Sequence, residues 1–426
     1  MRLPSLVPAI LLATVASPLF AQQPASSSAF TPDVAQRPAV KDALARIDAG
    51  FGAHVQEWIR LTEMPAKSEH EQQRAAYVKA QLEQAGYTAT IDSIGNVTAR
   101  RRGTGGGPVV VFAAHMDTVH PMDADLTVHR DSSSGKLVLR APGIFDNTAS
   151  VANLLAVARA MQQAHVQTRG DVVFVFTVQE ELGLVGMNYW LAHNPRPDLV
   201  VAMDGGLGPI DYGALGIYWT RYHFTGEGSH TNTSTGKPHP ARALAQAITS
   251  IYELRVPPNE GGAVYNVGML SGGSVFNAIP QDVSFTMDLR SVNPRLLDSL
   301  DNEITARVAR AAADQHVQWH KEIVQHLDAG GTEEMLRDRR HGTIVETAVA
   351  VHHFLGIDLG PREAEATGST DANVAVTRGI PAISVGRSLG GNQHTLAEWS
   401  DVQSALPATK MVLLLAVSLA GQGLTP

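Results

Sequence analysis

Histidine and carboxylate side chains follow several short apolar segments of this 426-residue sequence. Five of them stand directly after three such segments: His115 and Asp117 after 109–114, Glu180 and Glu181 after 172–178, and Asp204 after 199–203. Two more lie in polar turns, Asp146 just before the helical segment 149–164 and His394 after the apolar segment 382–385. The sequence has no cysteine. A metal would therefore have to be held by imidazole and carboxylate, which are ligands that suit Zn²⁺.

These side chains are expected to meet because of where they stand in the chain. In an open α/β sheet, ligands bind beyond the carboxyl ends of the strands, and three of the apolar segments here lead directly into polar residues of this set. Buried carboxylates are costly unless they are paired or bind a cation, and these motifs bring no Lys or Arg with them. Two Zn²⁺ would bring four positive charges, against three ligand carboxylates (Asp146, Glu181 and Asp204) and a bridging hydroxide. A single His-x-Asp or Glu-Glu is usually an ordinary loop or a solvated surface, so the prediction depends on the whole ordered set.

The apolar segments alternate with helical patterning, which is typical of an α/β protein. The four segments predict buried strands, and residues 149–164 predict a helix between the first two. This alternation favours a catalytic domain built on a doubly wound sheet, parallel or mixed. Residues 215–327 are instead patterned as strand, helix, two strands, helix and strand, the order of a ferredoxin-like α+β unit. We expect this unit to be inserted into the catalytic domain.

The predicted organisation has five parts: a signal peptide (1–21), a flexible Ser/Pro/Ala-rich leader (22–40), a first catalytic part (41–214), the inserted domain (215–327) and a second catalytic part (328–426). The N-terminus carries one positive charge and then a short apolar run, which is typical of a secretory signal; a retained N-terminal anchor is the alternative. We therefore expect an exported protein, periplasmic or secreted, without stable membrane insertion after processing. The formal net charge of −8 argues against a nucleic-acid partner.

The motifs resemble those of a known family when they are taken together. The fragments are AAHMDTV, GIFDNTASVANLL, VQEELGLVGM, AMDGG, GGSVFNAIPQDVSFTMDLRS and NQHTLAEW. They are similar to motifs of the zinc exopeptidases that include peptidase T, the glutamate carboxypeptidases, aminoacylase and the acetylornithine and succinyl-diaminopimelate deacylases. The long segment after His230, TNTSTGKPHPARAL, is closest to peptidase T-like members. The inserted domain lies where this family carries its lid or dimerisation domain.

The resemblance implies a role for each residue of the set. His115 and Asp204 would hold one zinc, Glu181 and His394 the other, and Asp146 would bridge them, with a cis peptide bond after it. Glu180 would be the general base, and Asp117 would hydrogen-bond the imidazole of His115 and fix its tautomer. Co²⁺ or Mn²⁺ could replace Zn²⁺ at such ligands.

The inserted domain contributes three further candidates through the same resemblance. His230 matches a lid histidine that helps to polarise the scissile carbonyl, and Asn277 and Arg290 match positions that bind a substrate carboxylate. Alternatively, Asn277 caps a turn before Pro280 and Arg290 forms a structural ion pair. The resemblance also implies a homodimer through the inserted domain.

The sequence as a whole predicts a di-zinc hydrolase of amide bonds. The leading hypothesis is a di- or tripeptidase, or an exopeptidase, in which a metal-bridging hydroxide attacks the amide and Glu180 is the general base. The alternative is a deacylase of N-acyl amino acids that uses the same site. A more distant alternative is a non-catalytic periplasmic binding module, which would not need Glu180. A two-metal phosphoesterase would want more cationic residues around the site than the sequence offers.

Overall fold

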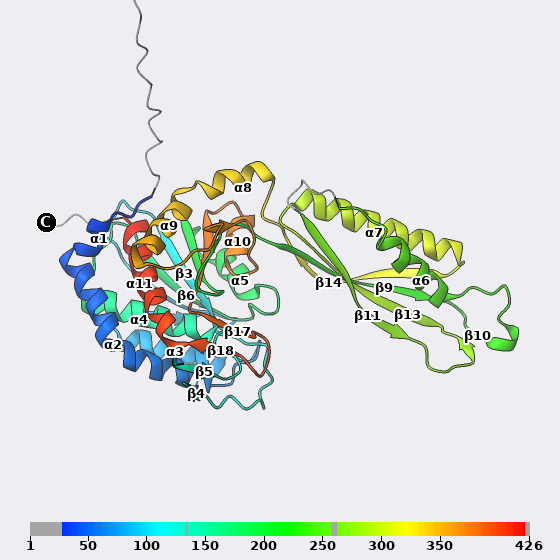
Figure 1. Ribbon diagram of the computed structural model, residues 1–426, viewed down its shortest axis with the longest axis horizontal. Helices are drawn as coiled ribbons and strands as arrows, with labels where there is room; N and C mark the ends of the chain where they lie inside the picture. The colour runs from blue at the N-terminus through cyan, green and yellow to red at the C-terminus, as the bar shows by residue number, and fades with distance from the viewer. Residues whose placement is uncertain (1–27, 133–134, 257–261, 422–426) are drawn as a thin grey trace, which may run out of the picture.

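The computed structural model describes residues 28–132, 135–256 and 262–421. Figure 1 shows two units, a larger one that contains both chain ends of the described part and a smaller one that extends from it. Each unit has its own hydrophobic core. We call the larger the core unit and the smaller, from β9 (Gly216–Thr225) to β14 (Gln318–Leu327), the insert.

The core unit is built on an eight-stranded mixed sheet, as the sequence predicted. Four central strands run parallel to one another: β6 (Val172–Thr177), β3 (Val110–His115), β7 (Leu199–Met203) and β16 (Ala382–Val385). They are rich in Val, Phe and Ala and almost completely buried, because helices cover both faces of the sheet. Four further strands complete the two edges: β1 (Ala89–Ile91), β2 (Val97–Arg101), β8 (Ile210–Asp211) and β15 (Ala364–Glu365).

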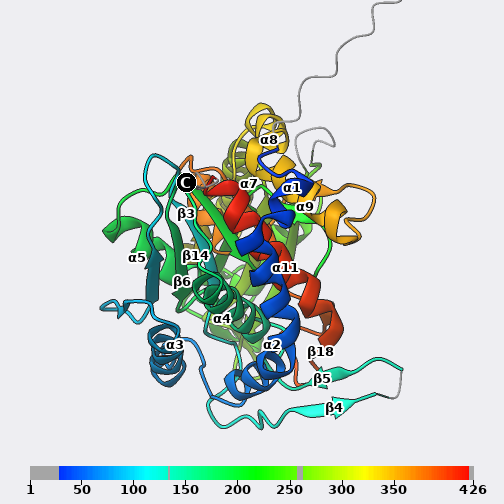
Figure 2. The ribbon, with the colours of Figure 1, turned by 90° about the vertical axis from the view of Figure 1, so that its left-hand side faces the viewer.

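Helices cover the sheet on both sides, which makes the core unit doubly wound. One layer, which faces the viewer in Figure 2, contains α2 (Pro38–Thr62), α4 (Thr148–Gln163), α9 (Thr343–Leu355) and α11 (Val402–Leu419). The other side has α5 (Val185–His193) and α10 (Ala372–Thr377), and α3 (Gln72–Gln84) packs beside β1 and β2. By length and composition α11 could cross a membrane, but 72% of it is buried, as expected for the central helix of a layer.

The core unit contains a second, four-stranded sheet, which the sequence did not predict. Its order is β17 (Gly390–Gly391), β18 (Trp399–Asp401), β5 (Val138–Arg140) and β4 (His129–Asp131). All its pairings are antiparallel. The sheet joins the segment before Asp146 to the two strands that flank His394, and so brings two distant parts of the chain to one place.

The insert has the strand–helix order that the sequence predicted. Its elements are β9 (Gly216–Thr225), α6 (Pro240–Ile251), β11 (Ala263–Gly272), β13 (Asp282–Ser291), α7 (Pro294–Asp314) and β14 (Gln318–Leu327). The strands form an antiparallel sheet in the order β11-β13-β9-β14, and α6 and α7 pack on one face of it. A small ribbon of β10 (Ser229–His230) and β12 (Ala278–Ile279) lies at the end far from the core unit (Figure 1). In the core unit, α8 (Glu333–Arg340) follows the insert.

The predicted flexible leader (22–40) is wrong for its described part. Residues 32–36 form α1 (Pro32–Gln36), and Phe30 and Val34 are buried in the core unit. The ring of Phe30 packs edge-on against Phe354, with centroids 5.2 Å apart. Burial of these apolar side chains outweighs the Ser/Pro/Ala composition from which the leader was predicted. The predicted signal peptide (1–21) lies outside the described residues.

Candidate metal centre

The polar residues at the strand ends meet at one edge of the central sheet. His115 ends β3, the two glutamates follow β6, and Asp204 follows β7. Because these strands are parallel neighbours, their carboxyl ends lie on the same side. Three groups of ligand atoms lie there, and the atoms of each group lie within 4.8 Å of one another. One group is His115, Glu180 and Glu181. The other two share Asp146, which lies with His115 and Asp204 in one and with Glu181 and His394 in the other.

Asp146 belongs to two of these groups and offers a different oxygen to each. Its Oδ1 lies 3.2 Å from His115 Nε2, and its Oδ2 lies 3.3 Å from His394 Nε2. The groups are completed by Asp204 Oδ2, 3.7 Å from His115 Nε2, and by Glu181 Oε1, 3.2 Å from His394 Nε2. One carboxylate thus stands between two half-sites, an arrangement suited to a pair of divalent ions. The imidazole and carboxylate donors fit Zn²⁺.

The loop that carries Asp146 is held by a buried carboxylate that the sequence did not single out. Glu398 precedes β18 and is fully buried. It accepts hydrogen bonds from the backbone N–H groups of Gly143 (2.9 Å), Phe145 (2.8 Å) and Asp146 (2.7 Å). The peptide bond that follows, Asp146–Asn147, is cis, as the family resemblance implied. Glu398 therefore fixes the position from which Asp146 reaches both half-sites.

Asp117 fixes the other side of the centre. Its carboxylate lies 3.3 Å from His115 Nδ1, and the backbone carbonyl of Asp117 lies 3.1 Å from the same nitrogen. A proton on Nδ1 leaves the Nε2 lone pair free to face Asp146 and Asp204. The same carboxylate accepts the backbone N–H groups of Glu180 (3.0 Å) and Glu181 (3.1 Å). Asp117 thus positions an imidazole and both glutamates together.

Burial and crowding of charge shift the pKa values of these groups. Burial alone would lower the pKa of His115, but Glu180, Asp117 and Asp146 surround it and raise that pKa well above its usual value. Burial raises the pKa of Glu180 well above its usual value, and nearby carboxylates add to the effect. Hydrogen bonds to Asp146 and Glu181 raise the pKa of His394 to about 10. The protein without metal therefore takes up protons where cations would otherwise balance the charge.

Known proteins are similar to this chain in sequence and in fold. The model of Peptidase family M20/M25/M40 matches residues 111–418. The chain belongs to this family. Curated relatives include the uncharacterized protein YqjE of Bacillus subtilis, 24% identical over 84% of this chain and 96% of the relative. Another is the N-carbamoyl-L-amino-acid amidohydrolase of Paenarthrobacter aurescens, 24% identical over 83% of this chain and 91% of the relative. A solved tripeptidase from Staphylococcus aureus has a TM-score of 0.73 at 18% identity and covers 87% of this chain and 98% of its own.

Membership of the M20/M25/M40 family makes this chain a hydrolytic enzyme and its cluster a candidate metal site.

The structure also corrects the charge argument made from the sequence, because an arginine lies among the carboxylates. Arg387 follows β16 and is fully buried. It forms ion pairs with Asp146 and Asp204. The only signal for it was its place just after a predicted strand, which no metal-ligand pattern selects.

The structure does not bring His230 and Asn277 to the metal centre. Both are exposed at the far end of the insert (β10 in Figure 1), where His230 Nε2 lies 3.4 Å from Asn277 Nδ2. Asn277 also accepts the Thr231 N–H through its backbone carbonyl, at 2.9 Å. The two candidates are thus neighbours of one another in this chain, but they are remote from the ions' ligands.

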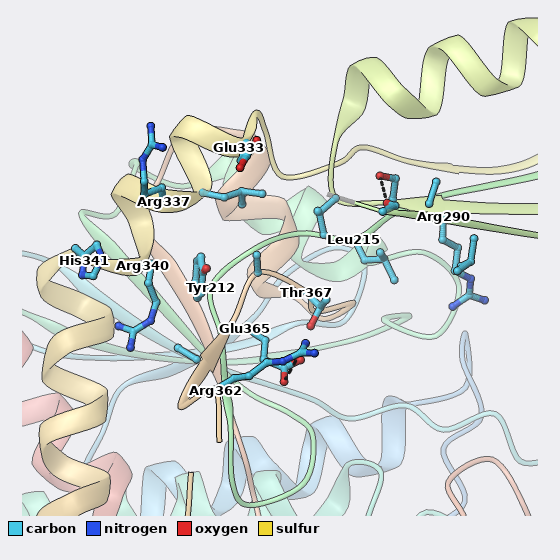
Figure 3. Close-up of a pocket in the computed structure, with 18 residues that line it drawn as sticks. Tyr212, Leu215, Arg290, Glu333, Arg337, Arg340, His341, Arg362, Glu365 and Thr367 are labelled. Carbon is cyan, nitrogen blue, oxygen red and sulfur yellow. Dashed lines mark hydrogen bonds and ion pairs between the residues drawn. The ribbon is translucent and has the colours of Figure 1, made fainter. Parts of the chain in front are cut away.

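Arg290 lies elsewhere, at the junction of the two units. It forms ion pairs with Asp288, at 3.0 Å, and lines a cavity of about 750 Å³. Figure 3 shows Arg290 on the insert side of this cavity and Arg340, His341 and Tyr212 on the core-unit side. None of the predicted metal ligands lines it. The cavity lies at the junction of the two units.

Proposed function

We propose that this enzyme is a two-metal peptidase that cleaves amide bonds of small peptides, as a di- or tripeptidase or an exopeptidase. The observation that carries the proposal is Asp146, whose two oxygens face His115 and His394 from opposite half-sites. The predicted ions are two Zn²⁺, with Co²⁺ or Mn²⁺ as substitutes. His115 and Asp204 would hold one ion, Glu181 and His394 the other, and Asp146 both.

Glu180 is the residue of the centre that is left to move protons. Divalent ions bound here would polarise the scissile carbonyl and lower the pKa of the attacking water. The Glu180 carboxylate accepts the proton that this water loses. It then delivers the proton to the nitrogen of the leaving amine as the C–N bond breaks, and a carboxylate and an amine are released. Asp117 supports this role because it fixes the Glu180 backbone.

A matched pair of variants tests these assignments. Glu180→Gln removes the base and is expected to abolish hydrolysis of di- and tripeptides while metal content stays at the wild-type level. Glu181→Gln removes a ligand from the neighbouring position and is expected to lower both activity and metal content. Metal analysis of each purified protein separates the two roles. Loss of metal in Glu180→Gln would contradict the role given to Glu180.

A second candidate is hydrolysis of N-acyl amino acids at the same site. It is favoured by the similarity to an N-carbamoyl-L-amino-acid amidohydrolase over most of both chains. The metal ligands do not distinguish a peptidase from an N-acyl amino acid hydrolase. They act on the amide bond that both enzymes cleave and not on the groups on either side of it. A panel of dipeptides, tripeptides and N-acetyl amino acids, assayed with the zinc-loaded protein, decides between them by kcat/KM.

We further propose that the insert forms a homodimer and that its residues bind substrate only in the assembled enzyme. In one chain His230 and Asn277 lie far from the ligands, and in a homodimer a second copy would bring an insert to each centre. The edge strand β11 supports this, since Val264, Met269 and Leu270 are about two-thirds exposed on it (66%, 59% and 64%). Arg290 would bind a substrate carboxylate after a change in its pairing. Sedimentation of the purified protein gives the oligomeric state.

We also propose export to the periplasm or the medium, on the basis of the N-terminal sequence alone. Mass spectrometry of the N-terminus of protein recovered from the native cell tests it. Cleavage near Ala21 is expected, and an intact N-terminus in the cytoplasmic fraction would contradict the proposal.

A further inference from the structure

Several contacts fix the position of Arg387 in the candidate metal centre. Its side chain is fully buried, and its guanidinium carbon lies 4.1 Å from the centroid of the Phe145 ring. Its backbone N–H donates to the carbonyl of Gly205 (3.2 Å), and its carbonyl accepts the side-chain amide of Asn153 (2.9 Å). Gly386 allows this approach, since a Cβ there would lie 2.2 Å from the Gly206 carbonyl. The guanidinium is thus a fixed charge and not a mobile surface group.

The guanidinium pairs with both carboxylates of the half-site that contains His115, and in the other half-site it pairs with the shared Asp146. Its Nη2 lies 3.1 Å from Asp146 Oδ1, the oxygen that faces His115. Its Nη1 pairs with Asp204 Oδ1, while Oδ2 of the same carboxylate faces His115. No ion pair between Arg387 and Glu181 or His394 exists among the described residues. Asp146 Oδ2 is the oxygen that faces His394.

We propose that Arg387 is a positioning residue that makes the two ion sites unequal: its charge weakens the site that contains His115 and Asp204, and it stabilises the metal-free protein. This inference rests on the proposed metal centre. It concerns the order and strength of ion binding and not the reaction itself.

The direction of the effect follows from competition for the same carboxylates. A cation beside a carboxylate lowers its affinity for a proton by roughly ten- to a thousandfold, and a divalent ion at Asp204 or Asp146 Oδ1 meets the same competitor. In the metal-free protein the guanidinium instead balances buried negative charge, which would otherwise destabilise the fold. Removal of the charge should therefore tighten one ion site and weaken the empty fold. A purely structural arginine would not do both.

The experiment measures each site alone. His394→Ala leaves the site of His115 and Asp204, and His115→Ala leaves the site of Glu181 and His394. Arg387→Gln, which keeps a hydrogen-bond donor but no charge, is added to each background, and Arg387→Lys, which keeps the charge, is the matched control. Zn²⁺ affinity of the metal-free proteins is measured by competition with a chelator, and urea unfolding of the same samples gives their stability.

We expect Arg387→Gln to raise the Zn²⁺ affinity of the His394→Ala protein by about tenfold or more. The affinity of the His115→Ala protein should change far less, the metal-free midpoint of unfolding should fall, and Arg387→Lys should stay close to its background. Unchanged or lower affinity in the first background, or an equal rise in both, overturns the proposal.

Three further outcomes keep the test decisive. If Arg387→Gln folds only with Zn²⁺ present, the rate at which a chelator removes Zn²⁺ replaces the titration, and it must be slower than in the matching background. A variant that does not fold even with Zn²⁺ shows a structural role and overturns the proposal. If the wild-type protein binds no Zn²⁺, the proposed metal centre itself fails. Unchanged affinity in a protein that binds Zn²⁺ overturns only the role of Arg387.

Discussion

The conservative substitution Glu398→Gln should destabilise the loop that carries Asp146 and so weaken metal binding. Glu398 touches no expected ion, yet its two oxygens accept three backbone N–H groups of the loop that carries Asp146. Oε1 accepts two of them, from Phe145 and Asp146, and Oε2 accepts the third, from Gly143. A glutamine keeps one oxygen and places an amide N–H₂ where the other oxygen was.

The structure gives the size of the effect. The amide oxygen should take the place of Oε1, because this keeps two of the three bonds. The Gly143 N–H then faces a donor in a fully buried place, which costs about 1–3 kcal/mol, and the two remaining bonds lose the added strength of an ionised acceptor. Glu398→Ala leaves all three donors without this acceptor, so its cost should be roughly three times as large.

Urea unfolding of the metal-free protein measures this loss, and Zn²⁺ titration measures its effect on Asp146. We expect Glu398→Gln to lower the free energy of unfolding by about 2 kcal/mol and to weaken Zn²⁺ binding by roughly ten- to a hundredfold. Glu322→Gln, a carboxylate whose side chain is 55% exposed on the insert, is the control and should change neither. Wild-type stability and Zn²⁺ affinity in Glu398→Gln would refute the reasoning.

Three further predictions follow from the same structure. Glu180→Gln should lower kcat by about a hundred- to ten-thousandfold in a peptide assay, with little change in KM. Asp117→Asn should lower Zn²⁺ affinity or kcat by roughly ten- to a hundredfold, since one change loosens both His115 and the glutamate backbone, and a wild-type result in both measurements would contradict its positioning role. Burial lowers the pKa of His352 from 6.5 to about 4, so it stays neutral in the fold while the unfolded chain takes up a proton below pH 6.5. The free energy of unfolding should therefore fall by about 2 kcal/mol from pH 7 to pH 5 through this residue, and His352→Leu should remove that part of the loss in chelator-treated protein.

The sheet and the ligand cluster could be predicted because both follow from local patterns. An apolar β-branched segment such as 172–178 forms a buried strand almost wherever it is placed, and parallel strands must end on a common edge. A polar residue directly after such a strand, like His115 or Asp204, is therefore positioned by topology alone. The prediction needed no knowledge of loop conformation, and so it was accurate for these residues.

The residues that sequence analysis did not identify are positioned by loops and by contacts between segments far apart in the sequence. Glu398 reaches the Asp146 loop because β18 pairs with β5, and these two strands lie about 260 residues apart in the sequence. Arg387 enters the centre through a turn that depends on Gly386 and on the packing of Phe145. Neither position has a spacing that distinguishes it from an ordinary loop residue. Phe30 escaped notice in the same way, because its partner Phe354 lies far along the chain.

The presence of Arg387 corrects the argument about charge, but the carboxylate cluster is still expected to bind cations. The sequence argument held that carboxylates without a basic neighbour demand a cation, and a basic neighbour is present. The centre, however, contains one guanidinium and four buried or nearly buried carboxylates (Asp146, Glu180, Glu181 and Asp204), and Arg387 forms ion pairs with Asp146 and Asp204. Neighbouring carboxylates raise the pKa values of both histidines, and burial raises the pKa of Glu180, so the protonated forms of these groups are favoured in the metal-free centre. Protons held in this way are released when divalent ions bind, so the centre is built for cations even with an arginine inside it.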